Sequence, residues 1–114
     1  MNAETINDRA KLIMHRLIAR RLATDTDLLA KAKADIADLL ERARQGEKIY
    51  DHVHEWAALL DEPLGELRRR LTSRREAMYR LRLSSPFAVH AGLSDPDLRR
   101  RIWRKARSGA PKTP

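Results

Sequence analysis

The sequence predicts an all-α protein, a single compact bundle of five to six helices. Apolar residues recur at three- and four-residue intervals along the chain, and no segment alternates apolar with polar residues as a half-buried strand does. Leu, Ala and Arg favour helices, whereas five aromatic residues are few for a sheet protein. The 114 residues suit one domain, expected at residues 1–108, followed by a mobile tail at 109–114.

Two long helices are expected in the first half, at about residues 4–23 and 26–45. Each has an apolar stripe on one side and charged residues on the other, as an amphipathic helix does. Residues 24–27 supply side-chain oxygens that can accept unpaired amide hydrogens of the second helix, and Gly46 can take the left-handed conformation that ends it. Because the connection is so short, the two helices are expected to pack as an antiparallel hairpin.

Shorter helices are expected in the second half. Asp51 is a cap candidate for a helix that ends at residues 61–63, and Pro63 suits the start of the next one, where a missing amide hydrogen costs nothing. Ser73-Arg74-Arg75-Glu76 has the form of a capping box, which predicts a helix that continues to about Leu83.

The segment Ser84-Ser85-Pro86-Phe87-Ala88-Val89 breaks the helical pattern, because proline disfavours helical backbone at the residue before it. We expect this segment to place Phe87 and Val89 on apolar neighbours and so to fix the last helix against the bundle. The alternative is that Phe87 faces a partner, since aromatic and arginine side chains are typical interface anchors. Residues 94–97 then indicate the start of a last helix that runs to about Ser108.

Positive charge is concentrated in the second half of the chain. The net charge is +8 overall, but residues 1–62 carry −2 and residues 63–114 carry +10. This asymmetry indicates an acidic partner, either the phosphates of a nucleic acid or an acidic protein surface. The simpler alternative is a solvated arginine-rich surface, with several arginines paired to acids of the first two helices.

Two groups of arginines carry the binding hypothesis. In the last helix, Leu98, Ile102 and Ala106 form a core-facing stripe with Trp103 beside it, which leaves the arginines on the wet side. The other group spans two short helices separated by a polar turn, an arrangement that also occurs in helix-turn-helix proteins. Guanidinium groups present planar forks of donors suited to phosphate or carboxylate. The expected nucleic-acid or partner-binding residues are Arg68, Arg69, Arg74, Arg75, Arg82, Phe87, Arg100, Arg101 and Arg104.

No catalytic residue, cofactor or metal site is predicted, and the protein is expected not to be an enzyme. His52 and His54 lie two residues apart and diverge on a helix, so they do not begin a tetrahedral metal site. The enzymatic alternative is a helical ribonuclease similar to the HEPN group, in which Arg9 would stabilise charge and His15 would move a proton. A third possibility is a structural subunit that acts through self-association, and a homo-oligomer stays open.

Three features that the sequence lacks bear on where the protein works. The chain has no cysteine, no apolar run long enough to span a membrane, and no signal-peptide pattern at residues 1–11. We therefore expect a soluble, cytoplasmic protein with no membrane partner.

Two stretches, residues 55–87 and 95–107, resemble a known family. They contain a Trp-x-x-Leu-Leu stretch, the motif Leu-Arg-x-Ser-Ser-Pro-Phe and a closing helix with arginine and tryptophan. With this combination the chain resembles a family of small uncharacterised all-helical bacterial proteins that is loosely associated with toxin-antitoxin type loci. The resemblance implies a partner-binding or regulatory protein, such as an antitoxin-like regulator that binds DNA or a toxin, and it implies no catalytic role. The positions it marks are Trp56, Leu59, Leu60, Arg82, Ser84, Ser85, Pro86, Phe87, Arg101 and Trp103.

Overall fold

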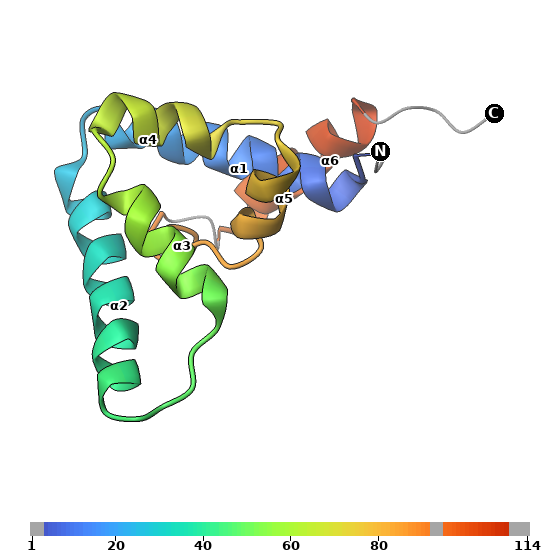
Figure 1. Cartoon of the computed structure of the whole chain (residues 1–114). Helices are drawn as coiled ribbons and strands as arrows, with labels where there is room; N and C mark the ends of the chain where they lie inside the picture. The colour runs from blue at the N-terminus through green and yellow to red at the C-terminus, as the bar shows by residue number, and fades with distance from the viewer. Residues whose placement is uncertain (1–3, 92–94, 110–114) are drawn as a thin grey trace.

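Six α-helices make up the computed structural model, which describes residues 4–91 and 95–109 and contains no strand within those ranges. The all-α class and the number of helices are therefore confirmed (Figure 1). Gly109 caps the last helix, and the rest of the expected mobile tail, residues 110–114, lies outside the described residues. The helices are α1 (Ile6–Leu22), α2 (Thr26–Arg44), α3 (Asp51–Leu60), α4 (Leu64–Leu71), α5 (Glu76–Arg82) and α6 (Pro96–Ser108).

The central helix of the fold is α1. Three other helices, α4, α5 and α6, pack along it (Figure 1). Buried side chains therefore point away from the axis of α1 in several directions. Leu12, Ile13 and Ile18 are among these buried residues. Near the amino end of α1, the Arg9 Nε donates to the Ala106 carbonyl oxygen at 3.1 Å and ties α1 to the carboxyl end of α6.

The expected antiparallel hairpin of α1 and α2 is not the main pairing of either helix. After the turn at residues 23–25, α2 leaves the axis of α1 and packs mainly against α3 (Figure 1). The reason lies in the width of the two apolar surfaces. Three helices already cover α1, whereas α2 buries only a narrow stripe of Leu28, Ala32 and Ile36, which one partner helix can cover.

The two ends of α2 follow their sequence signals. The Asp25 Oδ1 accepts a hydrogen bond from the Leu28 amide at 3.2 Å, which caps the first turn. At the other end, Gly46 has a φ of 96°, in the left-handed region. The amide of Glu47 donates to the Arg42 carbonyl oxygen at 3.0 Å, as in a Schellman motif.

Three helix starts differ from the expected ones. The first residue of α4 is Leu64, and Pro63 is the cap that precedes it. Asp51 is the first residue of α3 rather than its cap, and α3 has no side-chain cap. The start of α5 is Glu76 rather than Ser73, because the Ser73 hydroxyl accepts from the Arg75 amide at 3.1 Å and closes a short turn before the helix. A capping box is found instead at residues 5–8, before α1.

The segment after α5 packs into the core through Phe87. This side chain is fully buried and lies edge-to-face with Trp56, with ring centroids 6.1 Å apart. The Trp56 Nε1 donates to the Ser84 hydroxyl at 3.3 Å, so the start of the segment is also fixed to the core. Val89 is 83% exposed, and the expectation that it packs on apolar neighbours is wrong. The turn over residues 87–91, closed by amide donors to the Phe87 carbonyl oxygen, directs Val89 outward.

Candidate anion-binding groove

A shallow groove between α1 and α4 gathers four arginine side chains. Its volume is about 530 Å³. Ala19 and Gly65 contribute almost no side chain to it, and a Cβ placed on Gly65 would meet no atom within 4 Å, so this part of the groove is open. The lining residues are Arg16, Ala19 and Arg20 of α1, Gly65, Arg68 and Arg69 of α4, and Thr72.

Arg68 is oriented by the carboxyl end of α1. Its Nε donates to the Ala19 carbonyl oxygen at 2.7 Å. Carbonyl groups in the last turn of a helix lack intrahelical partners and carry the negative end of the helix dipole, so a guanidinium is favourable there. This bond holds the side chain between the two helices and uses only one of its five donors.

Arg69 lies at the edge of the groove. Its Nη1 pairs with the Glu66 Oε2 at 3.0 Å, and its side chain is 78% exposed. Arg70 approaches the same carboxylate, with 3.4 Å between its Nε and the Glu66 Oε1. Because one carboxylate is divided between two guanidinium groups, it neutralises only part of the positive charge of α4.

Arg16 and Arg20 are supplied by α1. They lie one helical turn apart, so their side chains share one face of the helix. Among the residues that the structure describes, neither guanidinium has a hydrogen bond or an ion pair. The lining of the groove thus carries four positive charges and no carboxylate, since Glu66 only reaches its edge. Like charges in one groove repel each other, and a bound phosphate or carboxylate would relieve that repulsion.

The exposed face of α6 is a second basic surface. Arg100, Arg101 and Arg104 are all exposed there, as expected, while Ile102 and Ala106 of the apolar stripe are buried and Leu98 is partly buried. Arg100 pairs with Asp97 of the same helix. The guanidinium groups of Arg101 and Arg104 have no partner within residues 4–91 and 95–109.

The turn between α4 and α5 carries Arg74 and Arg75, and both are exposed as expected. Arg74 lies near Glu4, a carboxylate that precedes α1. The pKa of Glu4 is lowered mainly by a hydrogen bond from the Tyr79 hydroxyl, then by Arg9 and by the charge of Arg74. The Glu4 carboxylate therefore interacts with Tyr79, Arg9 and Arg74, and Arg75 is not among its partners.

Arg82 and Phe87 do not belong to the binding surface. Arg82 is 1% exposed and Phe87 is fully buried, so the expectation that they contact a partner is wrong. The Arg82 Nη1 instead donates to the carbonyl oxygens of Leu71, at 3.1 Å, and Ser73, at 2.8 Å. Its guanidinium also lies over the Tyr79 ring, 4.6 Å from the centroid. Arg82 therefore holds the turn between α4 and α5 from inside the fold.

His15 is a buried residue that pairs with Ser85. Its Nδ1 lies 2.7 Å from the Lys11 carbonyl oxygen, which can only accept, so this nitrogen carries the hydrogen. The Nε2 of the neutral ring is then an acceptor, and the Ser85 hydroxyl donates to it at 2.8 Å. The pKa of His15 is lowered to about 4, mainly by burial and to a smaller extent by the positive charge of Arg82.

The geometry of α1 does not support the ribonuclease alternative. Residues six apart are separated by about 240° around a helix, so Arg9 and His15 point to different sides. Arg9 bonds to the Ala106 carbonyl oxygen and to Glu4, whereas His15 points into the core. The two side chains therefore do not face a common site.

Arg16 and Arg20 were not among the predicted binding residues. Residues 1–62 have a net charge of −2, so the charge distribution along the chain did not point to basic residues in this half. Their spacing of four residues is a usable signal, because arginines one turn apart on a helix line the same face. That α4 lies beside this face is a tertiary fact that the local pattern does not contain.

Within the described residues, none of the helices is long and apolar enough to cross a membrane. The same part of the chain contains no group of three His, Asp or Glu side chains that could hold a metal ion. No protein-family model matches the chain, and searches of curated proteins and of solved structures each gave no significant match.

Proposed function

We propose that the protein is a non-enzymatic binding protein that holds the phosphate backbone of a nucleic acid through its basic surfaces. The observation that carries the proposal is the groove lined by Arg16, Arg20, Arg68 and Arg69, whose lining contains no carboxylate. A guanidinium can donate two parallel hydrogen bonds to phosphate oxygens, and a row of phosphates can engage several arginines at once. The exposed arginines of α6 would extend the contact.

The lining of the groove favours contacts to the backbone over contacts to bases. The groove is shallow, and none of its lining residues is aromatic, so it offers no platform on which a base could stack. Contacts from arginine and threonine to phosphate carry little sequence information. We therefore expect affinity that depends strongly on salt and weakly on sequence.

An antitoxin-like regulator is the biological form of this proposal. The motif at residues 81–87 and the closing arginine helix support it by resemblance. In that role the protein would act in the bacterial cytoplasm, where the basic surface would bind DNA, and an acidic toxin surface is the competing partner.

Fluorescence anisotropy with a short labelled DNA duplex tests the proposal. The double variant Arg16→Ala/Arg20→Ala should weaken binding about tenfold or more, because two phosphate contacts are lost. Arg42→Ala/Arg44→Ala is the matched control, since it removes the same charge from exposed side chains of α2. Equal weakening by both double variants would show that net charge, not the groove, governs binding.

A second probe separates nucleic acid from an acidic protein. Polyglutamate presents carboxylates at a different spacing from backbone phosphates. If polyglutamate binds as tightly as the duplex, and the Arg16→Ala/Arg20→Ala variant loses that binding, the partner is an acidic protein surface and the nucleic-acid proposal is wrong.

A further inference from the structure

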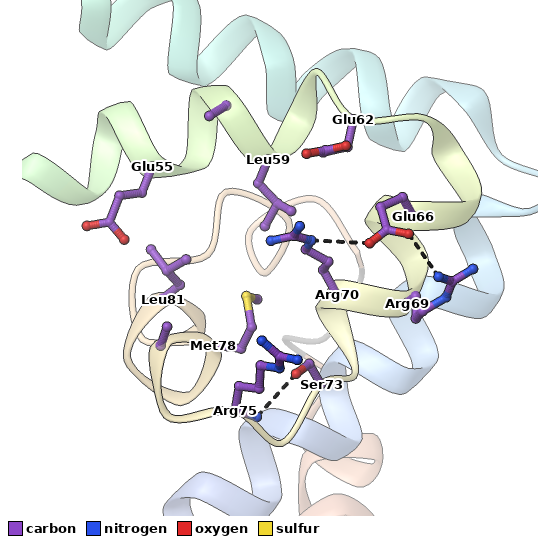
Figure 2. A pocket seen from close by; sticks show the side chains of 12 residues that line it. Glu55, Leu59, Glu62, Glu66, Arg69, Arg70, Ser73, Arg75, Met78 and Leu81 are labelled. Atoms are coloured by element: carbon purple, nitrogen blue, oxygen red, sulfur yellow. Dashed lines mark hydrogen bonds and ion pairs between the residues drawn. The ribbon is translucent and has the colours of Figure 1, made fainter.

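A second cleft lies on the other side of α4, where α3, α4 and α5 enclose a volume of about 670 Å³. Figure 2 shows Leu59, Met78 and Leu81 pointing into it, so its floor is apolar. Ala58 and Ala77, both exposed, also line the cleft and leave it open to solvent. The volume and the apolar floor are those of a site that accepts a large apolar group.

Opposite charges line the two edges of this cleft. Glu55 comes from α3 and Glu62 from the turn that follows it, and they lie on either side of Leu59 along this edge (Figure 2). Arg70 and Arg75 come from α4 and from the turn that follows it (Figure 2). Glu66 of α4 also lines the cleft and pairs with Arg70, so the cleft is acidic on the α3 side, and Arg75 supplies the positive charge on the opposite side that no lining carboxylate pairs with.

The charges at the edges are incompletely neutralised by the chain itself. Glu55 pairs with Arg80 at 2.8 Å, an exposed ion pair that water and salt can compete with. Among the described residues, the Glu62 carboxylate and the Arg75 guanidinium have no side-chain partner, and they lie on opposite edges. An occupant with complementary charges could pair with both.

We infer that this cleft docks an amphipathic helix of a partner protein. Glu55 and Leu59 lie one turn apart on α3. The Glu62 amide donates to the Leu59 carbonyl oxygen at 3.1 Å, which places Glu62 one turn further along, just past the end of the helix, so the three residues form a stripe along this edge of the cleft. A helix lying beside that stripe would present a basic, a large apolar and a second basic residue at the same spacings, with an acidic residue turned toward Arg70 and Arg75. The apolar side chain would enter the cleft, as in other complexes of a helix in a groove. This site is separate from the proposed nucleic-acid function.

Binding of designed helical peptides tests the inference on the full chain. The first peptide is a stapled helix with the complementary pattern, the second exchanges its basic and acidic residues, and the third replaces its apolar anchor with alanine. We expect the first to bind and the other two to bind at least about tenfold more weakly in fluorescence anisotropy. Absence of binding by the first peptide, or equal binding by all three, would overturn the inference.

Three protein variants test whether the peptide binds in the cleft. Ala58→Trp should obstruct the cleft from an exposed position and abolish peptide binding, whereas Ala34→Trp, on the exposed side of α2, should leave it unchanged. Glu62→Arg should shift the preference toward the charge-exchanged peptide. Peptide binding that survives Ala58→Trp contradicts the assignment.

The same variants distinguish this inference from its competitors. Ala58→Trp should leave duplex binding unchanged, because Ala58 does not line the arginine groove. Arg69 lines both cavities and is therefore left unaltered in all variants. If sedimentation shows a dimer that Ala58→Trp dissociates, the occupant is a second copy of this chain and the partner helix is excluded.

Discussion

Single polar residues hold the interior of this protein together. His15 and Trp56 are both buried, and their ring nitrogens meet the hydroxyl groups of Ser85 and Ser84. A buried donor or acceptor without a partner costs free energy, so the two serines that precede Pro86 have a structural explanation. The Ser-Ser-Pro-Phe motif therefore reads as a core element rather than as a binding motif.

Stability should fall with acid in the range that His15 governs. The folded-state pKa of His15 is about 4, below its ordinary value of 6.5, so the unfolded chain binds the proton more readily. Stability is then complete above pH 6.5 and decreases as the pH falls toward 4, by a total on the order of 3 kcal/mol. Urea unfolding at a series of pH values measures this change.

An NMR titration of the His15 ring is the independent check. The ring signals should stay those of the neutral form down to about pH 4, and His15→Gln should flatten the pH dependence of stability above that pH. Titration of the His15 ring near 6.5 would contradict the assigned burial.

Arg82 should matter for stability although it is a cation. Arg82→Ala leaves the Leu71 and Ser73 carbonyl oxygens without this donor and opens a cavity, so unfolding should become easier by roughly 3 kcal/mol. Arg82→Met should recover part of the loss through packing alone. Arg80→Ala, at the exposed ion pair with Glu55, should have a much smaller effect in the same denaturation experiment. Equal effects at positions 80 and 82 would refute the structural role.

At the scale of helices and turns, the sequence predicts which segments are helical better than it predicts their partners. Cap signals at Asp25 and Gly46 act locally, so they were readable. The start of α5 could not be predicted in the same way. The Ser73 hydroxyl can accept a hydrogen bond either in a capping box or in a short turn, and in the structure it accepts from the Arg75 amide in a short turn. The pairing of α2 with α3 depends on which surfaces other helices already cover, and no local pattern contains that information.

The Phe87 side chain should be the main attachment of the segment between α5 and α6. Phe87→Ala should lower the free energy of unfolding by about 3 to 5 kcal/mol, because it removes the ring that packs on Trp56. Val89→Ala, two residues away and exposed, should change it by no more than about 0.5 kcal/mol. Chemical denaturation of both variants compares them directly, and similar losses would mean that the segment is not anchored through Phe87.

For the molecule as a whole, α4 separates two different surfaces. One side of it contributes Arg68 to the basic groove with α1, and the other contributes Arg70 to the amphipathic cleft with α3 and α5. The excess of arginine in the second half predicted the exposed basic residues of α4 and α6. It could not predict that Arg16 and Arg20 complete the groove, because helix packing joins segments that lie about 50 residues apart in the chain.

The salt dependence of duplex binding tests the central claim most directly. Each phosphate contact contributes about 0.9 to the slope of log affinity against log salt, measured between roughly 50 and 200 mM. The wild-type slope should be steep, Arg16→Ala/Arg20→Ala should reduce it by about 2, and Arg42→Ala/Arg44→Ala should leave it unchanged. A flat wild-type slope, or an identical slope in the groove variant, would contradict the account.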